Sequence, residues 1–523
     1  MGILTKKDLN NILALRFKED ICNKFSDIYL PSVFKDIYSG AFCIKKALEK
    51  EKNIVIVGDY DVDGIISCVI LSEFFDNIGS NYRVKIPNRF KDGYGLNENI
   101  INELDNVDLI ITVDNGITAF EAALLCEKKN IDLVITDHHM PGQTLPKAKA
   151  IINPKQKDCG FPNLEICGAV VTWYFIAAIK EVCKINYDMS SFIDLLGIAT
   201  IADMMELRDL NRLLVKKSLN YLNNTKRIAI KAIKQYYKKE KLNFDNIGFL
   251  IAPLINSAGR MNDAILSYNF LRAKDYKDAN ILLDQLISLN NARKNEEKIT
   301  IEESLKQINP NLKVIVVSNK NWHDGVLGIV ASRLAKCFKK PTFVFSENEE
   351  NLKGSARSIG NIDILKLIQN AKDIIINYGG HKGAAGLSIK KDKLKDFENI
   401  INEACLKIPQ KDFENSDEIL GELDPKDIDL DLCEIIENFE PFGYKNPLPL
   451  FEFKDFIVTN KTYIGQKHLK LNIIKDNIKL NAIFFNYNKD LNINDKISFI
   501  ASINKNTYKG FTNIQIMIKD LIF

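Results

Sequence analysis

Three short apolar segments of this chain each end directly in acidic or histidine residues. Residues 53–58 (NIVIVG) run into DYDVDG, residues 108–113 into DNG, and residues 131–136 into DHH. Continuous apolar runs of this length are typical of strands buried in a parallel sheet, and helical periodicity follows the first two. Because ligand sites of such sheets gather at the carboxyl ends of the strands, the pattern predicts one crevice lined by all three motifs.

Side chains with metal-binding chemistry would line this crevice: Asp59, Asp61, Asp63, Asp114, His138 and His139. In an extended segment, residues two apart point the same way, so the first three carboxylates would share one side. Clustered carboxylates repel one another unless cations neutralise them, and oxygen ligands with some imidazole suit Mn²⁺ or Mg²⁺ better than Zn²⁺. Two such ions, ~3.5–4 Å apart, can activate water and hold both oxygens of a phosphoryl transfer.

The DxDxDG segment also matches the start of a calcium-binding EF-hand loop. Such a loop needs a bidentate Glu at its twelfth position, which here is Ile70, and a helix in front of it. The preceding residues are an apolar, strand-like run instead. The sequence therefore disfavours a calcium loop.

The rest of the chain divides into segments of different pattern. Residues 163–304 are helical in pattern, interrupted by the loop-like NSAGRMND at Asn256–Asp263, and Tyr276–Ser304 has few helix breakers. A second α/β unit begins at residues 312–317 and carries WHDGVLGIVASRL, GSARSIG and YGGHKGAAGLS. Short alternating strands after PFGYKNPLP predict a small β-barrel of the OB-fold type.

Composition excludes several classes of protein. With 46% hydrophobic and 27% charged residues, the 523-residue chain is predicted to be soluble, folded and multidomain. Its longest apolar run, Cys167–Ile179, is too short for a membrane span, so we expect no membrane partner. The N-terminal residues lack the apolar stretch of a signal peptide, and ten scattered cysteines without a CxxC pair predict a reduced, cytoplasmic protein. A net charge of +3 does not by itself imply a nucleic-acid partner.

Together the motifs resemble the DHH phosphoesterase superfamily, and within it the branch of exonucleases that degrade single-stranded DNA from the 5′ end. The segments that carry the resemblance follow the family's order: GDYDVDG (58–64), PNRFKDGYGL (87–96), TVDNGI (112–117), TDHH (136–139), GIATIAD (197–203), NSAGRM (256–261), WHDGVLGIVASRL (322–334), GSARS (354–358) and GGHKGAAG (379–386). The barrel after PFGYKNPLP is similar to the OB domain of that branch.

The patterns and the resemblance predict an α/β fold with two lobes, a parallel-sheet DHH domain and a DHH-associated domain, joined by a long helix and followed by a C-terminal OB-fold barrel. Residues 1–50 are predicted to be a helical segment that packs on the first lobe, and residues 51–275 the DHH domain with a helical extension. Residues 276–304 would form the bridging helix, 305–410 the DHH-associated, nucleic-acid-binding domain, and 411–523 the OB-fold domain.

The resemblance implies metal ligands at five positions: Asp59, Asp61, Asp114, His138 and Asp203. It implies two divalent ions, Mn²⁺ or Mg²⁺, that share Asp114, with His138 and Asp203 at the second ion. His139, Asp63 and Asp137 are the catalytic candidates. His139 would face the scissile phosphate, while the two aspartates would support the ligands from behind.

Nucleic-acid contacts, including a pocket for the 5′-phosphate, are implied at Arg89, Arg260, Ser355, Arg357, Ser358, Gly379, Gly380 and His381. Arginine can grip a phosphate with two parallel hydrogen bonds, as lysine cannot. The paired glycines would let the backbone approach a phosphate closely, and His381 would donate a hydrogen bond.

The predicted function is a metal-dependent exonuclease that hydrolyses single-stranded DNA from the 5′ end in recombination and repair. Single-stranded DNA is the expected partner, with a helicase and a single-strand-binding protein as further candidates. One alternative is a phosphoesterase for oligoribonucleotides or cyclic dinucleotides, but such relatives lack the barrel and the KDGYG segment. The other is a non-catalytic DNA-binding replication scaffold, which would need broken metal motifs, whereas each motif here is intact.

Overall fold

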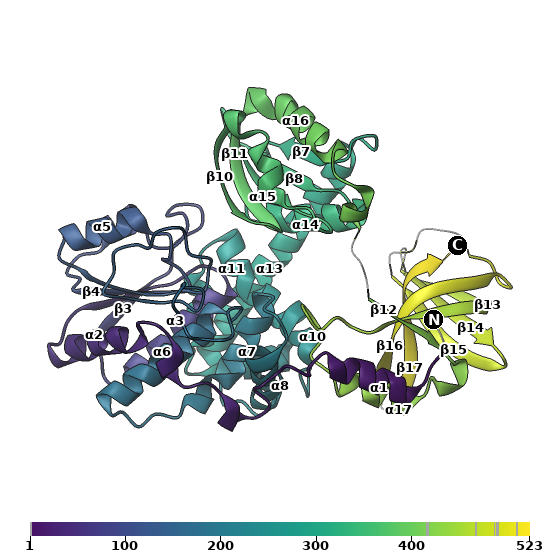
Figure 1. The fold of residues 1–523 in the computed structure, drawn as a ribbon, viewed down its shortest axis with the longest axis horizontal. Coiled ribbons are helices and arrows are strands. Elements are labelled where there is room, and N and C mark those ends of the chain that lie inside the picture. Colours follow the sequence, from purple (N-terminus) through teal and green to yellow (C-terminus); the bar gives the residue numbers. More distant parts are fainter. Residues whose placement is uncertain are drawn as a thin grey trace. The chain divides into compact units, whose positions relative to one another are not determined.

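The computed structural model of the chain describes residues 3–414, 418–465, 468–485, 487, 491–508 and 511–522 (Figure 1). The chain divides into two compact units. The larger contains Leu30–Asp203 and Leu219–Ser416, and the smaller contains Met1–Tyr29, Met204–Ser218 and Asp417–Phe523. None of the helices in the described ranges combines the length and the apolar character needed to cross a membrane.

The first lobe of the larger unit is built on a parallel sheet with the strand order β3-β2-β4-β5-β6. Its strands are β2 (Ile54–Val57), β3 (Tyr82–Lys85), β4 (Leu109–Val113), β5 (Asp132–Thr136) and β6 (Ala150–Ile152). All three predicted strands are present, as β2, β4 and β5, and they are neighbours. Their residues are buried on both faces, which explains why the sequence shows continuous apolar runs.

Helices cover both faces of this sheet. On one face, α4 (Glu98–Glu103) and α5 (Phe120–Lys128) share a core with β2, β4 and β5. On the other face lie α2 (Ile37–Glu49), α3 (Val62–Asn77) and α6 (Gly168–Cys183), which also pack on one another. Because α3 is enclosed by these neighbours, it is apolar around most of its circumference.

The helical extension contains α7 (Ile193–Ala202), α8 (Asp209–Asn223), α9 (Ile228–Tyr236), α11 (Ala252–Met261), α12 (Ile265–Leu271) and α13 (Tyr276–Leu305). The prediction of a loop at Asn256–Asp263 is wrong, because α11 continues to Met261. Its small residues reflect close packing: the Ser257 hydroxyl donates to Leu254 O at 2.6 Å, and a Cβ on Gly259 would lie 2.3 Å from Tyr60 O.

The second lobe of the larger unit has a mixed sheet with the order β10-β11-β9-β8-β7. Its strands are β7 (Ile315–Asn319), β8 (Thr342–Glu347), β9 (Asn351–Arg357), β10 (Ile375–His381) and β11 (Ala384–Lys390). Only β7 and β8 pair in parallel, and the other pairings are antiparallel. Its helices are α14 (Leu327–Phe338), α15 (Ile364–Gln369) and α16 (Leu394–Leu406).

The smaller unit contains a closed barrel of five strands in the order β13-β14-β15-β17-β16, closed by pairing of β16 with β13. These strands are β13 (Leu450–Ile464), β14 (His468–Lys475), β15 (Ile478–Phe484), β16 (Lys496–Tyr508) and β17 (Phe511–Ile522), with β12 (Ile419–Leu423) and α17 (Leu430–Glu437) beside them. A five-stranded closed barrel is the architecture expected of an OB-fold.

The N-terminal residues pack on this barrel rather than on the first lobe, so that part of the prediction is wrong. Strand β1 (Ile3–Leu4) pairs in parallel with β12, and α1 (Lys6–Leu15) buries Leu9 and Leu13 in the barrel core. Of the first fifty residues, those from Leu30 onward, namely the short turn Pro31–Val33 and α2, pack in the first lobe. Residues 204–218 also belong to the smaller unit, where the Arg208 guanidinium pairs with Asp20. Helical periodicity predicts a buried face but not the partner that buries it.

Candidate metal centre and phosphate-binding residues

The ends of β2, β4 and β5 carry the buried acidic and histidine residues that the sequence placed there. Asp59 follows β2 after one glycine, Asp114 follows β4 directly, and Asp137 and His138 follow β5. Asp59, Asp114 and His138 are only 3%, 1% and 4% exposed. Asp114 adopts a left-handed backbone conformation (φ 62°) that turns the chain sharply as it leaves the strand.

The first motif does not stay extended, so the prediction that its three carboxylates share one side is wrong. Asp61 is the N-cap of α3, and its side chain accepts from the backbone N–H of Asp63 at 3.0 Å and of Gly64 at 3.2 Å. Asp63 therefore lies in the first helical turn. Its carboxylate accepts from the amides of Gly168 (2.5 Å) and Ala169 (2.8 Å), which ties α3 to the start of α6.

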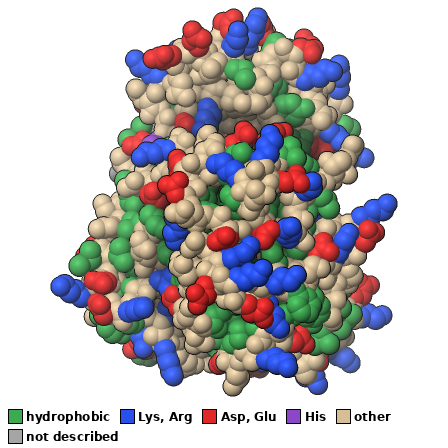
Figure 2. All heavy atoms as spheres, turned by 90° about the vertical axis from the view of Figure 1, so that its left-hand side faces the viewer, with side chains coloured by type: hydrophobic (Ala, Val, Ile, Leu, Met, Phe, Trp, Pro, Cys, Tyr) green, Lys and Arg blue, Asp and Glu red, His purple; other side chains and the backbone are tan. Residues whose placement is uncertain are grey.

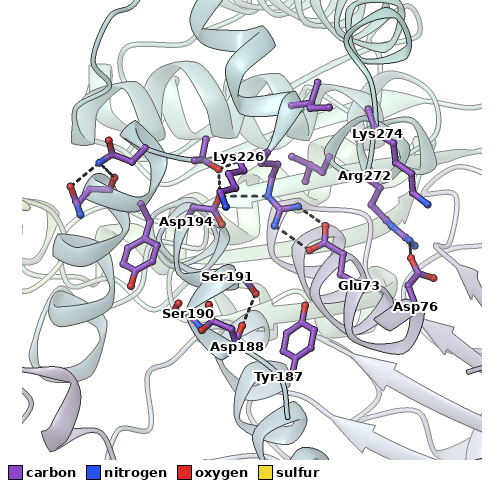
Figure 3. A pocket seen from close by; sticks show the side chains of 18 residues that line it. Glu73, Asp76, Tyr187, Asp188, Ser190, Ser191, Asp194, Lys226, Arg272 and Lys274 are labelled. Carbon is purple, nitrogen blue, oxygen red and sulfur yellow. Dashed lines mark hydrogen bonds and ion pairs between the residues drawn. The ribbon is translucent and has the colours of Figure 1, made fainter. Parts of the chain in front are cut away.

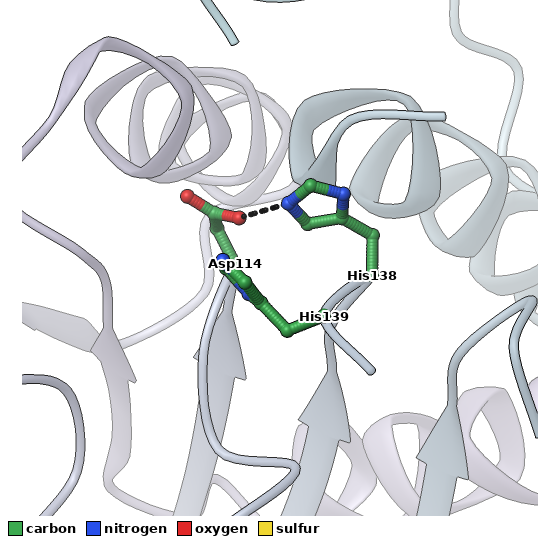
Figure 4. Close-up of side chains that lie close together, drawn as sticks. All are labelled: Asp114, His138 and His139. Carbon is green, nitrogen blue, oxygen red and sulfur yellow. Dashed lines mark ion pairs between the residues drawn. The ribbon is translucent and has the colours of Figure 1, made fainter. Parts of the chain in front are cut away.

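His138 brings the remaining ligand candidates together. Its Nε2 lies 3.2 Å from Asp114 Oδ1 (Figure 4). The same nitrogen lies 3.5 Å from Asp203 Oδ2 and 3.8 Å from Asp63 Oδ2. Asp203 is the C-cap of α7, so a residue from the helical extension completes a cluster that begins at the sheet.

Three overlapping groups have ligand atoms within 4.8 Å of one another: Asp59, Asp61 and Asp114; Asp63, His138 and Asp203; and Asp114, His138 and His139. Several of these atoms are buried and have no hydrogen-bond partner, namely Asp114 Oδ1, both ring nitrogens of His138, and Asp203 Oδ2. Buried polar atoms are almost always paired, so unpaired atoms that converge on one point fit bound cations.

The pKa shifts of these residues also fit bound cations. Burial, together with neighbouring carboxylates, raises the pKa of Asp59, Asp114 and Asp203 well above the usual value, and raises that of Asp63 to about 6. Burial lowers the pKa of His138 to about 3, so its imidazole is neutral and able to bind a metal. These raised pKa values mean that the carboxylates are costly to ionise together without a counter-charge. Divalent cations would supply that counter-charge.

His139 differs from His138 because it faces outward. Its side chain is 45% exposed, and its Nδ1 lies 2.8 Å from Asp137 Oδ1. Asp137 is held in turn by the backbone N–H groups of His138 (2.7 Å), His139 (3.0 Å) and Ile117 (2.9 Å). Burial opposes protonation of His139, but the bond and charge of Asp137 outweigh it and raise the pKa of His139 to about 9.

Arginines from both lobes of the larger unit gather beside this cluster. The Arg89 guanidinium lies 4.1 Å from the Tyr60 ring centroid, and Arg260, in the last turn of α11, donates to Gly325 O at 3.4 Å. Arg357 ends β9 and donates to Ala356 O at 2.9 Å. Burial and the Arg89 charge lower the pKa of Arg260 to about 10 and also lower that of Arg357. The three cations are therefore close enough to repel one another, as in a site for an anion.

The exposed strand β10 carries Gly379, Gly380 and His381. Burial and then the charges of Arg357 and His139 lower the pKa of His381, which places this strand end within electrostatic range of both lobes' site residues. Ser358 is different, because its hydroxyl donates to Ile362 O inside the second lobe. On the face of the larger unit that Figure 2 shows, basic side chains are scattered among acidic ones, so no broad basic patch replaces these specific residues.

Comparison with known proteins decides the family. The DHH family, N-terminal domain, matches residues 53–200, the DHHA1 domain matches 311–407, and the RecJ OB domain matches 419–520. The single-stranded-DNA-specific exonuclease RecJ of Haemophilus influenzae is 31% identical over 527 residues, which cover 93% of this chain and 91% of that protein. This chain belongs to the RecJ family.

Other RecJ proteins agree in sequence and in fold. The Bacillus subtilis RecJ exonuclease is 32% identical over 512 residues, which cover 95% of this chain. The chain spans 64% of the length of that relative. The crystal structure of Thermus thermophilus RecJ in complex with Mn²⁺ superposes with a TM-score of 0.86 at 26% identity, covering 99% of this chain and 76% of that one. The predicted resemblance and fold class are thus confirmed.

Two residues of the RecJ motifs have site geometry that the sequence analysis missed. Asn115 is buried; its Nδ2 donates to Val57 O (3.0 Å) and Val113 O (2.9 Å), and its Oδ1 accepts from Leu96 N (3.0 Å). It therefore joins the ends of β2 and β4 to the loop after β3 that carries Arg89. The signal was an amide directly after Asp114, at a strand end where a buried polar group needs partners.

Gly328 is the second missed residue. It lies in the first turn of α14, and a Cβ there would stand 2.7 Å from Arg357 Nη2 and 3.6 Å from Ser355 Oγ. The glycine thus leaves the space that the Arg357 guanidinium occupies. Its place inside WHDGVLGIVASRL was visible, but nothing in the sequence indicated that Arg357 approaches it.

Proposed function

We propose that this protein is a metal-dependent exonuclease that hydrolyses single-stranded DNA from its 5′ end, in DNA recombination and repair. The observation that carries the proposal is the set of buried ligand atoms of Asp114, His138 and Asp203, which lie within 3.5 Å of His138 Nε2 at the ends of the sheet and form no hydrogen bond. The RecJ relatives from Bacillus subtilis and Haemophilus influenzae are single-stranded-DNA-specific exonucleases, which supports the same function.

We assign two positions for Mn²⁺ or Mg²⁺ within this cluster. Asp59 and Asp61 would hold one ion, His138 and Asp203 the other, and Asp114 would belong to both, since its carboxylate takes part in two of the ligand groups. When bound, such ions supply positive charge for the attacking and departing oxygens and lower the pKa of a water molecule. The chain contributes the position of the ligands, because short turns after buried strands leave them little freedom.

The catalytic candidates act around that centre. Asp137 fixes the ring of His139 through Nδ1, which leaves Nε2 free to donate to a non-bridging oxygen of the scissile phosphate. Because the pKa of His139 is raised, that nitrogen carries its proton at neutral pH. Asp63 positions the ligands, since it clamps the first turn of α3 to the start of α6.

End recognition would belong to the arginine group, because the metal chemistry is the same at any phosphodiester. The Arg357 guanidinium donates one N–H to Ala356 O, which orients it. The side chains of Arg357 and Ser355 both lie next to Gly328. Arg260 and Arg89 add positive charge from the first lobe. Gly379, Gly380 and His381 of β10 would hold the strand backbone, while Ser358, whose hydroxyl is used inside the lobe, is left out of the pocket.

The barrel would guide the strand, and a helicase and a single-strand-binding protein would supply it. A reduced cytoplasmic location is consistent with the free cysteines, six of which are buried. These assignments complete the proposal. They rest on the motif-by-motif resemblance and on the match of residues 419–520 to the RecJ OB domain.

The test is digestion of DNA single strands labelled at the 5′ or the 3′ end, of duplex DNA and of oligoribonucleotides, with Mn²⁺, Mg²⁺ or a chelator. We expect immediate release of the 5′ label as a mononucleotide, resistance of the duplex, and no cleavage with chelator. Cleavage in chelator would contradict the metal centre. Early release of the 3′ label would contradict the direction, and cleavage of oligoribonucleotides alone would favour the alternative phosphoesterase.

A further inference from the structure

The larger unit has two adjoining cavities away from the metal centre, of about 720 and 510 Å³. They share Asn224, Thr225 and Lys226, so they form one elongated hollow. The larger cavity is shown in Figure 3, with Lys226 and Lys274 on one side and Tyr187 on the other. No step of the proposed exonuclease mechanism uses this hollow.

The smaller cavity has a lining of unusual composition. It contains lysines, amides, a hydroxyl and an aromatic ring, but no carboxylate: Asn223, Asn224, Thr225, Lys226, Lys231, Lys234, Gln235 and Tyr276. Lys234 Nζ donates to Asn223 O at 3.2 Å. In the described part of the chain, none of its three lysines forms an ion pair. Their positive charge is therefore available to an anion.

Three of the four carboxylates of the larger cavity are already paired with arginines. Arg227 pairs with Glu73 at 2.5 Å and with Asp194 at 3.5 Å, and Arg272 pairs with Asp76. The remaining acid of the lining is the N-cap of a short helical turn, Asp188, whose side chain accepts from Ser190 N at 3.0 Å. The larger cavity therefore has as many acids as bases in its lining, and the surplus of positive charge lies in the smaller cavity.

The hollow lies at the far ends of two helices that carry site residues. Asp61 caps the start of α3 and Glu73 lies in its later turns, ~18 Å along the helix at 1.5 Å per residue. Asp194 begins α7 and Asp203 ends it, ~13 Å apart by the same rise. The hollow is therefore separate from the metal centre, although α3 and α7 contribute Glu73, Asp76 and Asp194 to the lining of its larger cavity.

We propose that this hollow binds the phosphate group of a nucleotide. Lysines that lack a carboxylate partner suit phosphate oxygens, the side-chain amide of Gln235 can donate a hydrogen bond, and Tyr276, which is 46% exposed, offers a face for a base. Two sources share this chemistry, the strand that is being degraded and the mononucleotide released from it. The choice of a nucleotide rests on the proposed function, whereas the anion site itself does not.

The experiment is a lysine-reactivity footprint of the full chain in chelator, read by mass spectrometry. The probes are inorganic phosphate, deoxyadenosine monophosphate, a fifteen-residue oligothymidine and polyglutamate. We expect the three phosphate-bearing probes to protect Lys226, Lys231 and Lys234. Protection of a site scales as 1 + [L]/Kd, which is about tenfold at ten times Kd. Lys46 on α2 and Lys128 on α5, both exposed, are the internal controls.

The outcomes separate the sources and can overturn the site. Protection by the mononucleotide assigns the hollow to released product, and protection by the oligothymidine without the mononucleotide assigns it to the strand. Equal protection of Lys46 and Lys128, or equal protection by polyglutamate, would overturn the site, since either result means unspecific charge.

A matched pair of variants completes the test. Lys226→Gln with Lys231→Gln should abolish the protection of Lys234, and Lys46→Gln with Lys128→Gln should leave it unchanged. Cleavage of a pentanucleotide should be equal in both variants, because neither touches the metal centre. A chain that cleaves nothing but keeps the footprint would contradict the exonuclease function and leave this site standing. A chain that cleaves single strands but shows no protection of the lysines would contradict this anion site and leave the exonuclease function standing.

Discussion

In the first lobe, Asp59, Asp114 and His138 are buried at the ends of β2, β4 and β5, whereas the site residues of the second lobe lie on half-buried and exposed strand ends. Asp114 is 1% exposed, while β10 presents Gly379–His381 openly. Buried carboxylates need a permanent counter-charge, so the first lobe is suited to resident cations. Exposed donors keep their hydration until a ligand arrives, so the second lobe is suited to binding and releasing a strand.

The largest effect on cleavage is expected from a change at Asp114, in the buried site of the first lobe. Asp114→Asn removes the negative charge proposed to serve both ions, so cleavage should fall by at least ~100-fold, which corresponds to about 2.7 kcal/mol of transition-state stabilisation. Asparagine tolerates the left-handed conformation of this position (φ 62°), so the melting temperature should change little. The measurement is the single-turnover rate with Mn²⁺. A rate within a few-fold of wild type, with unchanged melting, would rule out the shared ligand.

A substitution in the second lobe should change the preference for 5′-phosphorylated strands rather than abolish cleavage. Arg357→Ala should reduce cleavage of 5′-phosphorylated strands about tenfold more than cleavage of 5′-hydroxyl strands, because hydrogen bonds to charged groups contribute about 1.5 kcal/mol or more. Arg357→Lys should recover part of the preference, since a point charge replaces a bidentate grip. The readout is the ratio of rates on the two strands. Equal reductions on both would move end recognition to Arg260 or Arg89.

A smaller change in the same lobe sharpens the comparison. Gly328→Ala places a Cβ 2.7 Å from Arg357 Nη2, so the guanidinium must shift. We expect a loss of phosphate preference in the same direction as in Arg357→Ala but only a few-fold, with unchanged or slightly higher stability because alanine favours the helix by up to about 1 kcal/mol. Gly142→Ala is the control, since its nearest neighbour is Thr144 O at 3.5 Å. An unchanged preference would mean that Arg357 does not need this position.

The smallest effect on cleavage is expected from the smaller unit. Leu13→Ala removes a fully buried side chain of α1 from the barrel core and should lower the free energy of unfolding of that unit by about 2–3 kcal/mol. Cleavage of a pentanucleotide should stay within about twofold, as the proposed metal ligands all lie in the larger unit. Leu15→Ala on the same helix, where the side chain is 66% exposed, is the control. Equal stability of the two variants would contradict the packing of α1 on the barrel.

The sequence alone determined the features of this RecJ protein that are local along the chain. The apolar runs predicted β2, β4 and β5, and the residues directly after them predicted where Asp59, Asp114 and His138 gather. These inferences held because a strand buried on both faces has few alternatives, and because parallel strands bring their carboxyl ends to one edge. The long helix α13 was visible for a similar reason, since its few breakers lie within one continuous segment.

Only the tertiary structure decided what depends on contacts between distant segments. The N-cap at Asp61 turned Asp63 toward the amides of Gly168 and Ala169, about a hundred residues further along the chain. Strand β1 pairs with β12, and this pairing places α1 on the barrel. The helical periodicity of α1 is equally compatible with packing on the first lobe. The sequence shows Gly328 only as a glycine within a helix, and its role in leaving space for Arg357 depends on the contact between α14 and β9. A side-chain pattern states which surface must be covered or which charge must be balanced, but the partner is chosen by the free energy of the whole fold.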